Sequence, residues 1–183
     1  RAPVRNLAAM AAQDAHWDQV EEAVEFLSAG ETREAIDLLE AVIAQNPGNE
    51  LAHAYLGNAL FELERYEEAL PRFVRALELA PRFLGAMVGA GQTLRFLGQH
   101  DRALRIAREA LKVKSDDPDA LYLAGCVCFQ RGEKHAATTY LDRFLETGPE
   151  IEVALEVRGM LRVLRGQVDP AIDESALGDD EDE

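Results

Sequence analysis

The residues best suited to chemistry in this chain are two cysteines and four histidines. Cys126 and Cys128 lie two residues apart, and on a helix this spacing directs their side chains toward roughly opposite sides, so they cannot readily share a metal ion. The histidines are His16, His53, His100 and His135. None of them forms the i, i+4 histidine pair with a glutamate that zinc protease helices carry. We therefore expect no metal site and no other cofactor.

One glycine-rich segment has the composition of a nucleotide-binding loop. Gly85, Gly89 and Gly91 lie within the segment LGAMVGAG. A nucleotide-binding loop of this kind follows a β-strand, whereas the pattern here predicts a helix with no strand before it. No serine or cysteine lies in a nucleophile-elbow pattern either. These observations predict a protein without catalytic activity.

The elements that must position any functional side chain recur at a regular period. An alanine returns every 34 positions, as Ala35, Ala69, Ala103, Ala137 and Ala171. A small residue precedes each alanine by 12 positions, as Ala23, Gly57, Gly91, Gly125 and Gly159. A glycine precedes four of them by five positions, as Gly30, Gly98, Gly132 and Gly166, and Glu64 replaces it once. Such a period is typical of a solenoid of helical hairpins.

Each recurring residue has a structural role in such a hairpin. A glycine in the middle of a helix costs roughly 1 kcal/mol relative to alanine, so Gly57 and its equivalents are expected where a neighbouring helix approaches closely. Gly30 and its equivalents stand where the first helix must end and the chain reverse, which favours a residue that tolerates a positive φ. Proline ends the hairpin at Pro47, Pro81 and Pro149.

The clearest unit, residues 50–83, resembles the tetratricopeptide repeat family, with the sequence ELAHAYLGNALFELERYEEALPRFVRALELAPRF. The resemblance implies an all-α fold, a right-handed superhelical solenoid of antiparallel helix-turn-helix repeats. The expected repeats are residues 16–49, 50–83, 84–117 and 118–151, followed by a partial repeat or capping helix over 152–172. Residues 1–15 form an N-terminal extension, and the acidic residues 173–183 are expected to be disordered.

Composition narrows the class of protein further. The chain has 48% hydrophobic residues and a formal net charge of −15. It contains no uninterrupted apolar run long enough to cross a bilayer, so we expect no membrane insertion. Two cysteines provide no disulfide framework, which favours a cytoplasmic location. The chain begins at Arg1, so processing or truncation at the N-terminus stays open.

The charges are distributed unevenly along the chain. Residues 14–50 carry ten acidic side chains and one basic side chain, Arg33, whereas residues 65–114 carry ten basic and five acidic side chains. A basic stripe follows one helix face through Arg102, Arg105, Arg108 and Lys112. Overall acidity would repel a phosphate backbone, and the stripe has no interleaved aromatic residues, so nucleic acid is not expected as a partner.

The resemblance also indicates a partner site. In tetratricopeptide arrays the first helix of each hairpin lines a concave groove. The corresponding partner-binding positions are Leu51, Tyr55, Asn58, Phe61, Val88, Gln92, Arg95, Phe96, Tyr122, Cys126 and Phe129. Polar residues among them can hydrogen-bond the backbone of a peptide or helix of a partner protein, while apolar pockets select its side chains.

Three interpretations of the function stay open at this point. In the first, the chain is a peptide-binding module, similar in architecture to the small bacterial chaperones that hold hydrophobic segments of secreted translocators. In the second, it is a scaffold or assembly factor that forms a homo-oligomer through its charged outer surfaces. The third makes it a non-catalytic subunit of a larger assembly.

Overall fold

The structure is a computed structural model that describes the backbone of residues 7–167 and the side chains of residues 14–167. Within this range the chain is entirely helical and turn, with no strand. Its helices are α1 Leu7–Ser28, α2 Thr32–Gln45, α3 Glu50–Glu62, α4 Tyr66–Leu79, α5 Leu84–Phe96, α6 His100–Val113, α7 Pro118–Gln130, α8 Lys134–Glu146 and α9 Ile151–Leu164.

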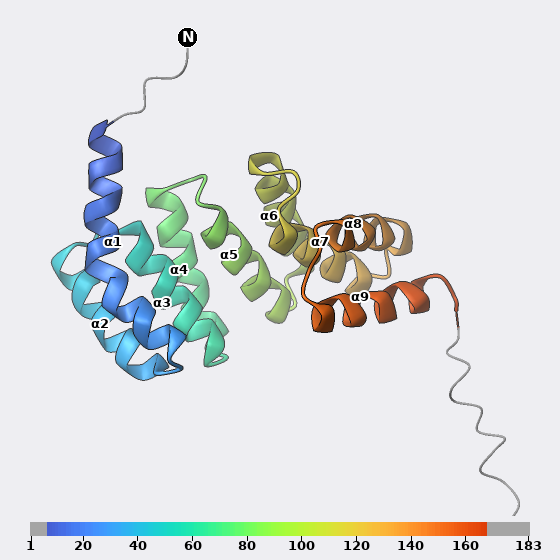
Figure 1. Cartoon of the computed structure of the whole chain (residues 1–183), viewed down its shortest axis with the longest axis horizontal. Coiled ribbons are helices and arrows are strands. Elements are labelled where there is room, and N and C mark those ends of the chain that lie inside the picture. The colour runs from blue at the N-terminus through green and yellow to red at the C-terminus, as the bar shows by residue number, and fades with distance from the viewer. Residues whose placement is uncertain (1–6, 168–183) are drawn as a thin grey trace, which may run out of the picture.

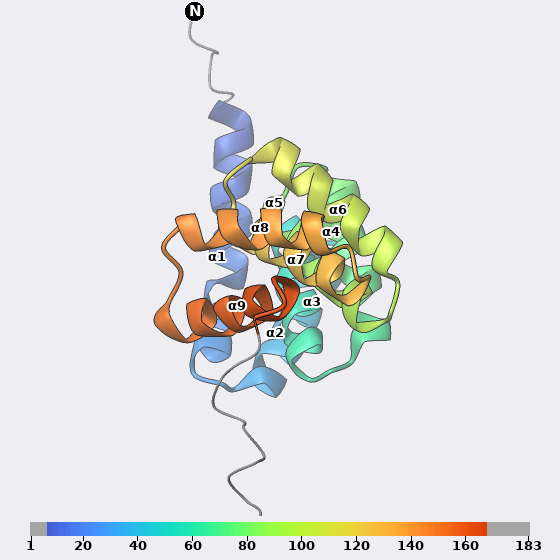
Figure 2. The same cartoon turned by 90° about the vertical axis from the view of Figure 1, so that its right-hand side faces the viewer.

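The helices form hairpins that are stacked in sequence order. The first helices α3, α5 and α7 begin at Glu50, Leu84 and Pro118, which follow one another at the period of the sequence repeat. Each packs mainly against the second helix of its own hairpin and against the second helix of the preceding hairpin. Figure 1 shows the resulting row, with α1 and α2 at one end and α8 and α9 at the other. Figure 2 views the C-terminal end, where α8 and α9 lie in front. The predicted all-α repeat fold is thus confirmed.

The turns between paired helices use the predicted glycines. Gly30, Gly98, Gly132 and Gly166 all have positive φ, between 68° and 78°. In the remaining hairpin, Glu64 adopts φ 58° in the same place, the left-handed region that glycine occupies most easily. The turn between α3 and α4 therefore has the same geometry as the turns that contain glycine. Because Glu64 has a side chain, this conformation strains its backbone.

Three of the five small residues lie where a side chain from another helix approaches. A Cβ atom on Gly57 would lie 2.9 Å from the ring of Phe73, and one on Gly91 would lie 2.3 Å from Leu123 Cδ2. Gly125 stands in the same relationship to Leu141, at 2.5 Å. Gly159 differs, because none of the described residues lies within 4 Å of its Cβ position. The close-approach prediction is therefore confirmed for Gly57, Gly91 and Gly125 but not for Gly159.

The core runs along the array as three buried clusters that share half-buried residues at their borders, and it is rich in alanine. The periodic alanines Ala35, Ala69, Ala103 and Ala137 are all 0% exposed. Larger fully buried side chains, among them Leu39, Phe73, Leu94 and Leu141, fill the space between neighbouring hairpins. Because each hairpin covers its apolar face only against its neighbours, stability is a sum of nearest-neighbour contacts.

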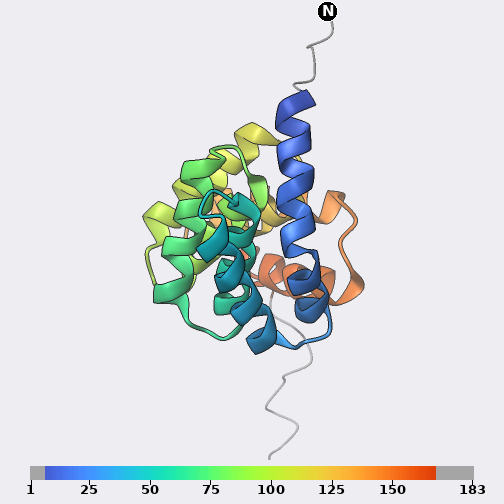
Figure 3. The ribbon, with the colours of Figure 1, turned by 90° about the vertical axis from the view of Figure 1, so that its left-hand side faces the viewer.

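The N-terminal helix is longer than a repeat requires. α1 begins at Leu7, inside the segment assigned to the extension 1–15, and its first turns project beyond α2 and α3 (Figure 3). Its middle is tied to the α2–α3 turn by Asn49, whose Nδ2 donates to His16 O at 3.0 Å and to Gln19 Oε1 at 3.1 Å. The expected disordered tail 173–183 and the end of the segment 152–172 lie outside the described residues.

Candidate functional site

The predicted groove residues lie on the first helices α3, α5 and α7, which are neighbours in the stack. Asn58 and Phe96 are exposed, and Phe96 retains 50% of its accessible surface. Cys126 is buried and belongs to the floor of this surface. The others are half-buried, namely Leu51, Tyr55, Phe61, Val88, Gln92, Arg95, Tyr122 and Phe129.

An aromatic cluster joins the C-terminal ends of α3 and α5. The rings of Phe61 and Phe96 meet edge to face with centroids 5.4 Å apart. Tyr66, the first residue of α4, stacks on Phe96 at 5.0 Å and meets Phe61 at 5.2 Å. Contacts of this kind contribute about 0.5–1.5 kcal/mol beyond their buried area. The cluster therefore holds Phe96 in a fixed orientation while half of its surface stays open.

Arg95 is fixed next to this cluster by two contacts. Its guanidinium carbon lies 4.3 Å from the centroid of the Phe96 ring, and its Nε donates to Gln92 Oε1 at 2.9 Å. The cation over the ring is an attractive arrangement, and it leaves the remaining guanidinium N–H groups able to donate to a ligand. Phe96, Arg95 and Gln92 thus combine an apolar face with hydrogen-bond donors.

The C-terminal part of the surface centres on Tyr122. Its hydroxyl donates to Glu156 Oε1 on α9 at 3.1 Å, and its ring lies 5.3 Å from that of Phe144. Burial, together with the neighbouring Cys126 and Glu156, raises the pKa of Tyr122 well above its usual range. Burial also raises the pKa of the Cys126 thiol. Both groups are therefore neutral at physiological pH, and neither has the character of a nucleophile.

The N-terminal part of the surface contains Leu51 and Tyr55 on α3. Leu51 lines a hollow of about 530 Å³, together with Glu50 and residues 80–84 of the α4–α5 connection. The Tyr55 ring meets the ring of Trp17 on α1 edge to face, with centroids 6.2 Å apart. Trp17 is 39% exposed, so it extends the aromatic surface onto α1.

The structure brings together only part of the predicted set. Phe61, Phe96, Arg95 and Gln92 form one contiguous group, whereas Tyr55 and Tyr122 belong to separate aromatic pairs.

The predicted set omits two aromatic residues of this surface, Tyr66 and Trp17. Tyr66 lies on a second helix, whereas the family resemblance indicates first helices only. No sequence pattern indicates it, because every second helix begins at the equivalent place and the contact of Tyr66 with Phe96 depends on how neighbouring hairpins pack. Trp17 lies on α1, before the first of the three helices that carry the predicted residues.

The groups first considered for chemistry are dispersed in the structure. Cys126 and Cys128 are both buried as free thiols, and burial raises the pKa of Cys128 to about 11. Within the described part of the chain, no three His, Cys, Asp or Glu residues are grouped so as to hold a metal ion. Among the helices of residues 7–167, none combines the length and apolarity that a membrane span requires.

A family model described as tetratricopeptide repeat matches residues 26–83 and 60–125. Together these matches extend from residue 26 to residue 125, more than half of the 183-residue chain. The chain belongs to the tetratricopeptide repeat family. Proteins of this family are generally interaction modules without catalytic residues, and no catalytic family is indicated for this tetratricopeptide protein.

Comparisons with individual proteins agree with this assignment. The DnaJ homolog subfamily C member 3 of Bos taurus is 26% identical over 135 residues, which cover 66% of this chain and 27% of that protein. The chain thus spans about a quarter of the length of this curated relative. MamA 41-end from Desulfovibrio magneticus RS-1 has a TM-score of 0.70 and 21% identity, covering 84% of this chain and 87% of that one.

A further solved structure is described by a binding property. YrrB, "a TPR protein with an unusual peptide-binding site", has a TM-score of 0.65 and 20% identity, covering 85% of this chain and 80% of that one. At these levels of identity, the two solved structures establish a shared tetratricopeptide fold.

Proposed function

We propose that this chain is a non-catalytic protein-interaction module that binds a peptide or helix of a partner protein along the first helices α3, α5 and α7. The bound segment would place apolar side chains against Phe96, Phe61 and Tyr66. Asn58, Gln92 and Arg95 would hydrogen-bond its backbone. This combination gives affinity through main-chain hydrogen bonds and specificity through the pockets that receive side chains.

The observation that carries this proposal is the half-exposed ring of Phe96. A large apolar side chain held rigidly by aromatic neighbours loses little conformational entropy when a ligand covers it. Fixed aromatic residues with an arginine beside them are also the side chains enriched among binding hot spots. Phe96 has both features, because it stacks on Tyr66 and carries Arg95 over its ring.

A displayed peptide library selected on the intact chain tests this function. The Phe96→Ser variant should weaken the selected peptides at least about tenfold, since truncation of a hot spot costs more than about 1–2 kcal/mol. Asn58→Ala should weaken them less. Phe61 and Phe129 are less suitable positions, because both pack against the core and a polar substitution there would also disturb the fold.

Val74→Ser is the matched control for Phe96→Ser. Val74 is an exposed apolar residue of α4, a second helix, and lies outside the predicted groove set. Peptides that bind this variant normally but lose affinity for Phe96→Ser would support the proposal. Peptides that bind Phe96→Ser as tightly as the intact chain would contradict it.

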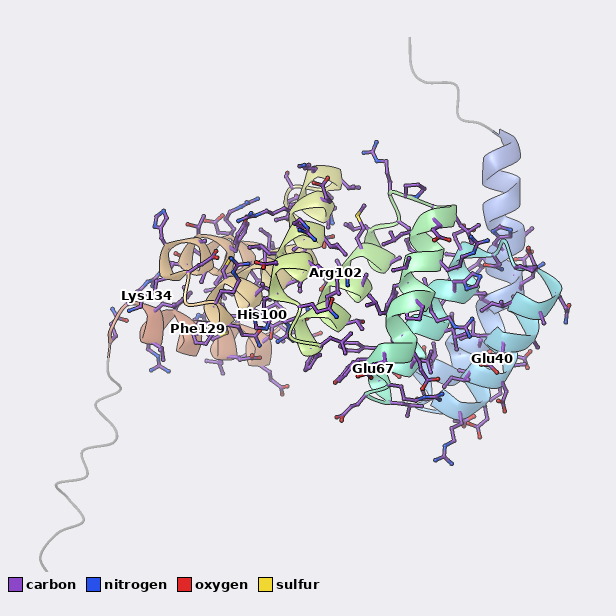
Figure 4. The ribbon with its side chains drawn as sticks, turned by 180° about the vertical axis from the view of Figure 1, so that it is seen from behind. Glu40, Glu67, His100, Arg102, Phe129 and Lys134 are labelled. Carbon is purple, nitrogen blue, oxygen red and sulfur yellow. The ribbon has the colours of Figure 1, made fainter. Side chains whose placement is uncertain are left out.

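A second candidate function is a self-associating scaffold, and the charge distribution favours it. Arg102, Arg105 and Arg108 are exposed along α6, whereas α1 and α2 present mainly carboxylates. Figure 4 shows Glu40 and Glu67 in the N-terminal half of the array and Arg102 nearer its middle. Under this hypothesis the acidic first hairpin of one copy meets α6 of another.

Ionic strength separates the two functions. The Debye length shortens from about 10 Å at 0.1 M salt to about 3 Å at 1 M, so association through exposed charges should weaken strongly over that range. Capture of an apolar peptide should hardly change. Sedimentation of the intact chain and of an Arg102→Glu, Arg105→Glu variant at both salt concentrations measures the difference. A salt-independent monomer would exclude the scaffold.

A further inference from the structure

The last helix carries an apolar face that no described segment covers. Ile151, Leu155 and Val163 of α9 are 77%, 58% and 67% exposed, respectively. They are spaced by multiples of four residues, with Gly159 between the last two, so all lie along one side of the helix. The opposite side, with Ala154, Val157 and Leu161, packs against the preceding hairpin.

At the position of Leu155, the preceding first helix α7 is covered by the second helix of its own hairpin, α8. Leu121 of α7 occupies the place of Leu155, one repeat earlier, and is 1% exposed. A Cβ on Gly125, the equivalent of Gly159, would meet Leu141 of α8, and a Cβ on Gly57 would meet Phe73 of α4. Since none of the described residues lies within 4 Å of the Gly159 Cβ position, α9 has the contact surface of a paired helix without a described pair.

The turn after α9 has the conformation of a turn within a hairpin. Gly166 has φ 68°, and the backbone N–H groups of Gly166 and Gln167 donate to Val163 O at 3.1 Å and Arg162 O at 2.9 Å. After α7, Gly132 and Glu133 make the corresponding bonds at 3.0 and 2.9 Å, and α8 begins at the next residue. The chain therefore reaches residue 168 by the same turn that leads into a covering second helix elsewhere.

We propose that residues 168–178 of this same chain cover the open face of α9 and complete a fifth hairpin. The segment has the sequence VDPAIDESALG. Asp169 before Pro170 is a favourable helix start, and Gly178 is a favourable stop. Ala171 falls in the position of Ala137, which is 0% exposed in α8. Under this proposal residues 173–178 belong to the fifth hairpin, in place of the disorder expected from their acidic composition.

Charge and connectivity favour this occupant over a second copy of the chain. The segment contains Asp173 and Glu174, and α9 carries Arg158 and Arg162 on the side of Leu155. Opposite charges that a hairpin brings close together attract each other and favour docking. A segment joined to α9 through a short turn has an effective concentration in the millimolar range, which a separate copy at micromolar concentration cannot match.

An engineered disulfide tests the assignment and its register. Gly159 and Ser175 are each one repeat after Gly125 and Leu141, which touch in the fourth hairpin. In the full chain, Gly159→Cys with Ser175→Cys should form a bond within one chain roughly tenfold faster than Gly159→Cys with Leu177→Cys, because a disulfide requires closely approaching Cβ atoms. Residue 177 lies about 200° further round a helix, so it serves as the matched control. The native thiols are buried, with raised pKa values, and react slowly.

Two readouts decide the outcome. A faster intrachain bond at residue 175 supports the fifth hairpin. The fifth hairpin would be overturned by equal rates of disulfide formation at residues 175 and 177, or by the absence of any bond. A bond between chains, seen on a non-reducing gel, would also overturn it. Adding Leu155→Asp should abolish the preference for 175, whereas Leu63→Asp, at an exposed leucine directly after α3, should leave it unchanged. A preference that survives Leu155→Asp would show that this face does not hold the segment.

Discussion

A Cβ atom on Gly89 of α5 would lie 2.3 Å from the ring of Phe73. The same ring lies 2.9 Å from the Cβ position of Gly57 on α3. Phe73 belongs to α4 and is 1% exposed, so its ring fills the space between two successive first helices at the points where both lack a side chain. The second and third hairpins are therefore joined by one aromatic ring and two glycines.

The Gly89→Ala substitution should destabilise the protein by about 1–3 kcal/mol, because the added methyl group overlaps a ring that has no room to move. The urea midpoint of unfolding measures this effect. Gly85→Ala in the same helix is the control. Its Cβ would meet only the edge of the Phe83 ring at 3.3 Å, and that ring is half-buried. Equal destabilisation by both substitutions would show that the Phe73 contact is not responsible.

Glu64→Gly should stabilise the protein by roughly 1 kcal/mol, since the left-handed conformation costs an L-residue about that much. Glu64 has φ 58° in a turn where the four equivalent residues are glycines. Thermal unfolding monitored by circular dichroism measures the change. Glu67→Gly, at an exposed position in the first turn of α4, should instead lower stability by roughly 1 kcal/mol. A loss of stability in both variants would argue against strain at Glu64.

The stability of the protein should depend on pH through His53. Burial lowers the pKa of His53 below its ordinary value of 6.5, and Arg72 and Arg75 add to this effect, while the bond to Pro47 O opposes it. The unfolded chain therefore binds a proton more readily than the folded chain. Consequently, stability falls as pH decreases below about 6.5.

His53→Met should remove this contribution. Met87 occupies the equivalent position in the next hairpin, and His53 Nδ1 has no hydrogen-bond partner among the described side chains. Urea unfolding at pH 7.5 and at pH 5.5 should show a smaller difference for His53→Met than for the native chain. His135→Gln, at an exposed position on α8, should retain the native difference. An unchanged pH dependence in His53→Met would assign the effect to other groups.

The repeat period predicted most of the fold, because backbone requirements recur with the sequence. A positive φ after each first helix and a small residue at a crossing are properties of single positions, so Gly98 and Gly125 could be interpreted correctly from the sequence. The contacts of Phe73 with Gly89 and of Tyr66 with Phe96 could not. They depend on the distance and rotation between neighbouring hairpins, which a pattern along one helix does not contain.

The last prediction concerns the attachment of α1 through Asn49. The Asn49 side chain is 0% exposed and has two roles: Oδ1 accepts from Ala52 N at 3.0 Å and caps α3, while Nδ2 donates to His16 O and Gln19 Oε1 on α1. Asn49→Asp keeps the acceptor but replaces the donor with an oxygen that faces two other oxygens. The cap should survive, and the link to α1 should be lost at a cost of about 1–3 kcal/mol.

Trp17 reports on this link because it is the only tryptophan in the chain and lies on α1 against Tyr55. In Asn49→Asp its emission should move to longer wavelength, and quenching by acrylamide should increase, before the rest of the array unfolds. Asp117→Asn is the control. Asp117 caps α7 through Ala120 N at 3.1 Å, and the substitution retains this acceptor far from Trp17. If Trp17 emission stays native in Asn49→Asp, burial of Val20 and Ala23 is sufficient to hold α1 in place.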